Sequence, residues 1–205
     1  HVWRTSWEML QRIVPATDGM IVTAGLPLFV TNGVYNAACV MAHGRIAGFI
    51  PKQHLAGDGL HYEPRWFRAW PAETRSEFHA DGQTWPIGDL LFDCDGVRIG
   101  FKICEDAWVA GRPGNRMAEC GVDIILNPSA SHFAFGKHEI RKRFVLEGSR
   151  SFGVSYVYAN LIGNEAVRLI QEQDPSKPFF LYFASMAPHA PYQVPEEYQK
   201  RYPQI

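Results

Sequence analysis

The sequence lacks an excess of charge of either sign. Its 205 residues include 20 Lys and Arg against 21 Asp and Glu, which gives a net charge of -1 at pH 7. Such a protein has no overall positive field to attract a phosphate backbone or an anionic membrane. We therefore expect neither a nucleic acid nor a membrane as a partner.

A long apolar run is also missing. The longest near-apolar stretch spans residues 179–188, about half of the roughly 20 residues that a spanning helix needs. No basic segment followed by an apolar one opens the sequence, which begins at His1 and not at a methionine. These features predict a soluble, cytoplasmic protein and indicate a fragment of a longer chain.

Cysteine is scarce, and its spacing forms no metal-binding or disulfide pattern. The four cysteines are Cys39, Cys94, Cys104 and Cys120, with no CxxC and no Cys/His pair of zinc spacing. We therefore expect no metal site and no disulfide framework. Three of the four are expected to be small buried apolar residues in a reducing cytosol, and Cys104 is the exception.

Glycine is absent from the last part of the chain. All 18 glycines lie at or before Gly163, whereas six of the 14 prolines fall within the last 31 residues. This change of composition indicates a boundary near residue 165, between a segment 1–165 and a segment 166–205.

The residues that are present suit a globular core, since 46% are apolar and 13% are aromatic. The dipeptide Asp95-Gly96 predicts a tight hairpin, and the aromatic-rich residues before Gly88 are expected to form a loop. Strands and helices alternate, and several strands are of the buried type, so we predict an α/β sandwich. The patterns predict helices at 6–13, 116–120 and 137–152, and strands at 20–28, 35–41, 90–94, 97–104, 122–127 and 154–159.

Cys104 ends a predicted strand and is followed directly by turn residues. This placement presents a side chain at the carboxyl edge of a sheet, where nucleophiles are often found and where a following helix start can favour the thiolate. A buried structural cysteine at a strand end is the commoner alternative.

The segment FKICEDAWVAGRPG resembles the nucleophile segment of the nitrilase superfamily of carbon-nitrogen hydrolases. The nearest resemblance is to the amidase domain of glutamine-dependent NAD synthetases, and it covers about residues 3–165. It implies a nitrilase-type α-β-β-α sandwich, truncated at both ends. The matching segments occur in the same order and read GLPL, VYNAACVMAHGRIAGFIPKQHL, HYEPRWF, ICEDAW, LNPSASHFAFGKHEIR and SYVYANLIGNE.

The resemblance implies that a cysteine thiolate attacks the side-chain amide of glutamine, releases ammonia and forms a thioester that water hydrolyses. Cys104 matches the nucleophile, Lys52 matches the lysine that stabilises the oxyanion, and Glu63 matches a glutamate that orients the lysine. The alternatives are a solvated surface lysine and a loop carboxylate paired with Arg65.

Four further residues are candidates for binding the substrate. Ser129 and Ser131 resemble the segment that lines the family's substrate pocket, although a serine turn cap explains them almost as well. Tyr62 and Trp108 are candidate pocket walls, and the alternative is that they belong to the core.

The family's general-base glutamate lies in a segment that would precede this sequence. Glu8 does not replace it, because Glu8 falls on the predicted amphipathic surface helix. We therefore expect a crippled glutaminase, with ATP and the NAD precursor binding a separate synthetase domain and no cofactor in this chain. The alternative is a non-catalytic remnant or a module for homo-oligomerisation.

From about Ala166 the chain resembles a segment of the sulfatases, through the runs KPFFLY and PHAPYQVPEEY. The sulfatase nucleophile motif, a Cys or Ser followed by x-Pro-x-Arg, does not occur in the sequence, nor do its acidic calcium ligands. His189 is therefore expected to be an ordinary loop histidine. A sulfatase-family fragment remains the second alternative, and the simplest account is a junction of two unrelated coding segments near Glu165.

Overall fold

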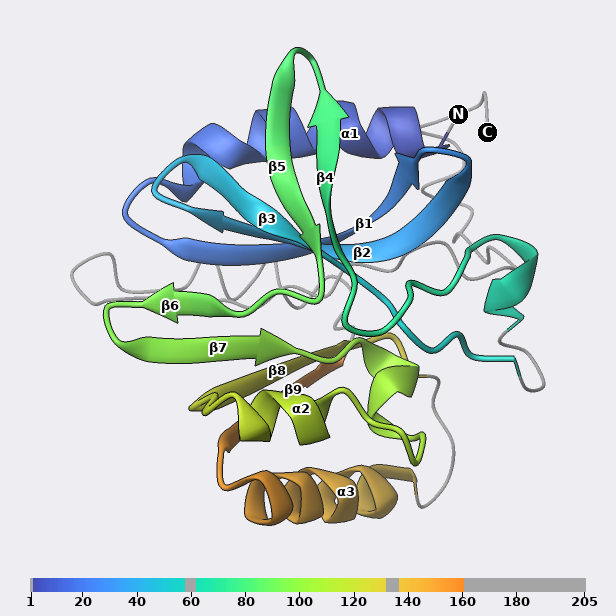
Figure 1. The fold of residues 1–205 in the computed structure, drawn as a ribbon, viewed down its shortest axis with the longest axis vertical. Coiled ribbons are helices and arrows are strands. Elements are labelled where there is room, and N and C mark those ends of the chain that lie inside the picture. Colours follow the sequence, from blue (N-terminus) through green and yellow to red (C-terminus); the bar gives the residue numbers. More distant parts are fainter. Residues whose placement is uncertain (1, 58–61, 132–136, 161–205) are drawn as a thin grey trace, which may run out of the picture.

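The computed structural model describes residues 2–57, 62–131 and 137–160, which form four layers (Figure 1). Helix α1 covers one face of a five-stranded sheet, here called sheet A, and helices α2 and α3 cover the outer face of a four-stranded sheet, sheet B. This order of layers confirms the predicted α-β-β-α sandwich. The proposed sulfatase-like segment, residues 166–205, lies outside the described residues.

Sheet A is built from a continuous part of the chain. Its strand order is β1-β2-β3-β5-β4, and all neighbours are antiparallel except β3 and β5, which pair in parallel. The strands are β1 (Ile21–Val30), β2 (Gly33–Ala42), β3 (Arg45–Pro51), β4 (Arg75–Ala80) and β5 (Gln83–Gly88).

Sheet B follows in the sequence and contains the parallel strands. Its order is β6-β7-β8-β9, in which β6 and β7 form an antiparallel hairpin and β7, β8 and β9 run parallel. The carboxyl ends of these parallel strands therefore meet at one edge of the sheet. The strands are β6 (Phe92–Cys94), β7 (Val97–Phe101), β8 (Ile124–Ser129) and β9 (Ser155–Asn160).

Among the described residues, three α-helices cover the sheets, and three short 3₁₀ turns lie in the connections between elements. The helix predicted at 137–152 has these bounds in the structure, whereas α1 begins four residues earlier than predicted. No helix in the described ranges is long and apolar enough to cross a membrane. The helices are α1 (Val2–Ile13), α2 (Gly114–Glu119) and α3 (Lys137–Phe152), and the turns are η1 (Val14–Thr17), η2 (Glu63–Arg65) and η3 (Cys104–Ala107).

Apolar side chains fill each space between the layers. Trp7 of α1 contacts the rings of Phe49, Phe78 and Trp85 on sheet A, which fixes the helix on that face. The buried cluster between the two sheets consists of Val40, Ile50, Phe101 and Leu126, and the cluster between sheet B and its helices consists of Met117, Val122, Ile125 and Val154.

The aromatic-rich segment before Gly88, expected to be a loop, contains the β4–β5 hairpin, so that prediction was wrong. The turn residues Asp81 and Gly82 both have positive φ, 48° and 71°, the conformation that favours Asp-Gly in a two-residue hairpin. This dipeptide, between Phe78 and Trp85, was the signal that could have revealed the hairpin.

The cysteines are also less buried than expected. Cys39 is fully buried in sheet A, but Cys94 is partly exposed and Cys120 is exposed. Only Cys39 therefore behaves as a small apolar core residue, because Cys94 lies in a short edge strand and Cys120 directly follows α2.

Gly88, at the end of β5, is required by its backbone conformation. Its φ is 129°, and a β-carbon there would overlap the carbonyl oxygen of Thr74. We expect Gly88→Ala to lower the free energy of unfolding by about 2 kcal/mol or more, measured by urea denaturation. Gly57→Ala is the control because its β-carbon meets no atom within 4 Å; equal effects of the two changes would contradict this role.

Candidate active site

Cys104 lies three residues beyond the end of β7, as the first residue of the turn η3. The backbone N–H of Lys102 still donates to the carbonyl of Leu126 in β8, at 3.0 Å, so the pairing of the two strands continues almost to the cysteine. Cys104 then turns away with a φ of 47°, a left-handed conformation that is uncommon for a residue with a side chain. The thiol is thereby placed at the carboxyl edge of sheet B.

The surroundings of Cys104 raise the pKa of its thiol. Burial is the main cause, and the nearby charges of Glu63 and Glu105 act in the same direction. The positive charge of Lys52 and a hydrogen bond from the backbone N–H of Ala130 oppose the increase but do not reverse it. Desolvation therefore outweighs the favourable contacts of the Cys104 thiol, and its pKa is raised.

Lys52 follows the last residue of β3 and is buried, with only 1% of the residue exposed. Its backbone N–H donates to the carbonyl of Asn36 in β2, at 2.8 Å, which continues the sheet A pairing to this residue. The side chain forms an ion pair with the carboxylate of Glu63. Lys52 is therefore not a solvated surface lysine.

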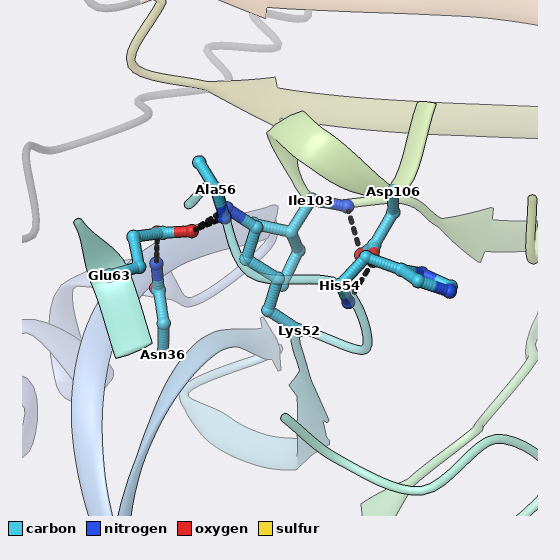
Figure 2. A network of polar contacts seen from close by, with 7 residues as sticks. All are labelled: Asn36, Lys52, His54, Ala56, Glu63, Ile103 and Asp106. Carbon is cyan, nitrogen blue, oxygen red and sulfur yellow. Dashed lines mark hydrogen bonds and ion pairs between the residues drawn. The ribbon is translucent and has the colours of Figure 1, made fainter. Parts of the chain in front are cut away.

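Glu63, the first residue of η2, is the buried partner of Lys52, and 4% of it is exposed. Its Oε1 accepts a hydrogen bond from Nδ2 of Asn36 at 3.1 Å, and its Oε2 accepts one from the backbone N–H of Ala56 at 2.6 Å (Figure 2). The carboxylate thus has several donors around it and pairs with Lys52, whereas the guanidinium of Arg65 lies over the Trp66 ring.

Lys52 and Glu63 come from the sheet A part of the chain and Cys104 from sheet B, yet the charges of both residues act on the thiol. An arrangement in which a carboxylate holds an ammonium beside a thiol is suited to nucleophilic attack by the sulfur on a carbonyl group. The cation can stabilise an oxyanion while the sulfur forms the new bond. The catalytic roles of the three residues remain predictions.

Ser129 and Ser131 occupy the carboxyl end of β8 and the residues just beyond it. The Ser129 hydroxyl is buried and donates to Oδ1 of Asn127 at 2.7 Å. Ser131 is held from β9, because its N–H donates to Oδ1 of Asn160 at 2.8 Å, and from α3, because Nη2 of Arg141 donates to its hydroxyl at 3.0 Å. Ala130, whose backbone N–H bonds to the Cys104 thiol, thus lies between two residues that are held by hydrogen bonds.

The two aromatic candidates lie in different surroundings. Trp108 follows η3 and packs on the Phe144 ring of α3 with 4.6 Å between ring centroids, while 39% of the residue remains exposed. Tyr62 precedes η2 and is 61% exposed. Neither is a core residue, and their role as pocket walls remains a prediction.

Sequence reasoning missed the polar residues that hold the site together: Asn36, His54, Asp106, Arg141 and Asn160. The available sequence signal was closeness to the candidate residues: Asp106 lies two positions after Cys104, and His54 lies two positions after Lys52. Within the described residues, no group of three or more His, Cys, Asp or Glu side chains could hold a metal ion.

Comparison with known proteins identifies relatives over most of this fold. The chain is 32% identical over 158 residues to a glutamine-dependent NAD(+) synthetase of Xanthomonas campestris, an alignment that covers 77% of this chain and 26% of the relative. A solved glutamine-dependent NAD(+) synthetase from Cytophaga hutchinsonii is 42% identical, with a TM-score of 0.72 over 80% of this chain and 26% of that one. The chain therefore spans about a quarter of the length of these relatives.

A more distant structure shows the same fold. An amidase of the nitrilase superfamily from Nesterenkonia has a TM-score of 0.58 at 16% identity, over 77% of this chain and 53% of that protein. In a Glu-to-Gln variant of that amidase, the active-site cysteine carries the product of Michael addition to acrylamide.

A family model for sulfatases matches residues 113–205. The described part of this range forms α2, β8, α3 and β9, which are integral parts of sheet B and its helical cover. These elements therefore belong to the fold that this chain shares with the amidase from Nesterenkonia. The described chain thus has the nitrilase-type fold of the carbon-nitrogen hydrolases, and the relatives it resembles over most of this fold include glutamine-dependent NAD(+) synthetases.

Proposed function

We propose that this site acts on the side-chain amide of glutamine and supplies ammonia for the amidation of an NAD precursor. The observation that carries the proposal is the buried Lys52–Glu63 ion pair, whose charges reach the Cys104 thiol. A buried ion pair is costly to desolvate and is weak evidence for stability. Its position beside a thiol at the carboxyl edge of a parallel sheet favours a chemical role.

The reaction requires one bond to form and one to break at the amide carbon. The sulfur of Cys104 attacks this carbon, and the carbonyl electrons move to the oxygen, where the Lys52 ammonium stabilises the negative charge. Collapse of this intermediate breaks the carbon-nitrogen bond, and ammonia leaves with a transferred proton. Water then hydrolyses the thioester to glutamate and the free thiol. Glu63 holds the Lys52 side chain in place through their ion pair.

Proton transfer limits this chemistry in the 205-residue polypeptide. Since burial raises the thiol pKa, a base must remove the proton before attack. In the described ranges, the carboxylates whose charges act on the thiol are Glu63 and Glu105. Glu63 is already engaged by Lys52, and Glu105 has the weakest effect on the thiol of the groups that act on it. Glu8 is exposed on α1. We therefore propose weak turnover, although the thiol can still be alkylated.

The whole-protein role extends beyond these residues. By analogy with its relatives, we propose that ATP and the NAD precursor bind a synthetase domain, which is the partner that uses the ammonia, in the cytoplasm. A non-catalytic module for self-association is the alternative, and its sign would be a stable oligomer with an unreactive Cys104. A sulfatase-family fragment is the second alternative, supported by the family match, and turnover of a sulfate ester would reveal it.

A diazoketone analogue of glutamine tests the site directly. We expect one covalent adduct on Cys104, lost in Cys104→Ala, slower in Lys52→Gln and retained in the control Cys120→Ala, because only Cys104 has the lysine beside it. The labelling rate should keep rising with pH beyond the ordinary thiol pKa of about 8.5, since burial raises the pKa of Cys104. Peptide mass spectrometry measures the adduct.

Ammonia release from glutamine is the second readout of this experiment. General-base catalysis contributes about 10² to 10⁴ in rate. Since none of the described residues is assigned as that base, steady-state release should be close to the background of Cys104→Ala. Rapid release that depends on Cys104 and falls in Glu63→Gln would show that Glu63 acts as the base. Absence of the Cys104 adduct would contradict the proposed function itself.

A further inference from the structure

Asp106 of η3 connects the turn that carries the thiol to the segment that carries the lysine. Its Oδ2 accepts a hydrogen bond from the backbone N–H of Ile103 at 3.0 Å. Its Oδ1 accepts one from the backbone N–H of His54 at 2.7 Å and lies 3.1 Å from Nδ1 of the same histidine. Figure 2 shows these contacts beside Lys52 and Glu63. One carboxylate therefore joins residues next to both groups of the proposed site.

The turn needs such a contact because Cys104 has a φ of 47°. A residue with a β-carbon in this left-handed conformation costs about 1–2 kcal/mol, so the surrounding structure must hold it there. Ile103 directly precedes the cysteine, and its N–H is fixed by Asp106. The carboxylate is buried, with 3% of the residue exposed, so its hydrogen bonds are formed in a low dielectric, where they are stronger than in water.

The lysine segment is fixed at its two ends by other contacts. At one end, the Lys52 N–H bonds to the Asn36 carbonyl, and the Lys52 carbonyl accepts from the N–H of Trp70 at 3.0 Å. At the other end, the Ala56 N–H bonds to Glu63. In the middle of the segment, the contact between His54 and Asp106 ties it to the nucleophile turn of sheet B.

From this geometry we propose that Asp106 and His54 are a positioning pair that sets the placement of the Cys104 thiol relative to the Lys52 ammonium. The proposal rests on the function proposed above. Neither residue needs to touch the substrate. Asp106 acts through the backbone of the two segments, and the His54 ring strengthens its hold on the lysine segment.

The charge of His54 makes this pair sensitive to pH. The hydrogen bond to Asp106 raises the pKa of His54, and burial opposes the increase. The charges of Asp106 and Glu105 favour the imidazolium, while the charge of Lys52 disfavours it. Because the pKa of His54 is raised in the folded chain, the stabilisation from its ring contact with Asp106 is complete below the ordinary histidine pKa of about 6.5. It is lost as pH rises through the pKa of the folded state.

Alkylation of the 205-residue chain by acrylamide tests the positioning role. The measured quantity is the alkylation rate of Cys104 divided by that of the exposed Cys120 in the same molecule. In Asp106→Asn, whose amide nitrogen cannot accept the Ile103 hydrogen bond, we expect this ratio to fall about tenfold, since misplacement by about 1 Å can cost 10²-fold. The control is His79→Gln, whose ring lies on the exposed β4–β5 hairpin beside Thr84, and its ratio should equal that of the unaltered chain.

His54→Gln supplies a readout that a purely structural role would not move. It keeps the backbone hydrogen bond to Asp106 and removes only the ring. The fall in its Cys104 to Cys120 alkylation ratio, relative to the unaltered chain, should therefore be largest near about pH 6 and shrink towards about pH 9. Ratios for Asp106→Asn and His54→Gln within twofold of the unaltered chain, with folding intact by circular dichroism, would overturn the proposal.

The glutamine analogue separates this proposal from the proposed function. If the analogue labels Cys104 but the two variants change nothing, the positioning role is wrong and the function stands. If the analogue fails to label Cys104 in the unaltered chain while the acrylamide ratios still fall in both variants, the function is wrong and the positioning role stands.

Discussion

Replacing Glu63 with leucine is expected to lower the free energy of unfolding by about 3–5 kcal/mol, because it leaves the Lys52 ammonium buried without its counter-charge. The hydrogen bonds from Asn36 and from the Ala56 backbone to the carboxylate are lost as well. Urea denaturation measures the change. It should be among the largest effects of any single substitution in the described chain.

The double variant Lys52→Met/Glu63→Leu separates charge from packing. Removing both charges should recover most of the lost stability, since a buried ion pair can often be replaced by apolar residues at little cost, but should not restore labelling of Cys104. Glu139→Ala, which breaks the exposed ion pair with Lys142, is the matched control and should change nothing measurable. Equal instability of the double and single variants would mean that packing, not the unpaired ammonium, is the cause.

Replacing Lys102 with methionine is expected to stabilise the protein at pH 7 by up to about 3 kcal/mol. Lys102 follows β7, is fully buried, and has its ammonium 4.6 Å and 4.5 Å from the ring centroids of Phe152 and Tyr156. Burial and the positive charge of Arg112 lower the pKa of Lys102 to about 8, against the weaker effects of Glu147 and Asp106.

The sign of the pH dependence follows from the lowered pKa. Above the ordinary lysine pKa of about 10.5 the amine is neutral in both states and imposes no penalty. As pH falls from there to about 8 the unfolded chain is protonated first, so the folded state loses stability, and below pH 8 the penalty is constant. The advantage of Lys102→Met should therefore disappear at high pH. Lys142→Met, at an exposed position, should show no such pH-dependent gain.

The features of the fold that could be predicted from sequence are those with a local signal. The segment 137–152, predicted as a helix with basic residues, forms α3 with these bounds, and Asp95-Gly96 predicted the β6–β7 hairpin. Asp81-Gly82 carries the same signal for the β4–β5 hairpin, but the many aromatic residues around it favour a loop on sequence alone. The parallel pairing of β3 with β5 has no local signal, since it depends on how the chain crosses between them.

The residues of the candidate site also differ in whether a local sequence signal marks them. Cys104, Lys52 and Glu63 can be proposed from the sequence because the resemblance rests on the residues around each of them. The contact between His54 and Asp106 joins positions 52 residues apart, and only the packing of the two sheets brings them together. The donors at Ala56 and Ala130 are backbone N–H groups, which any residue type except proline supplies, so no sequence pattern could mark them.

The separation of the two sheets along the chain has a consequence for folding. Sheet A is complete by Gly88, and sheet B begins only at Phe92, so each can form from its own half of the chain. The thiol and the ammonium meet only when the halves dock through the cluster of Val40, Ile50, Phe101 and Leu126. Reactivity of Cys104 towards an amide-like reagent therefore reports the docking step itself, and in a refolding experiment it should return later than the secondary structure of either half.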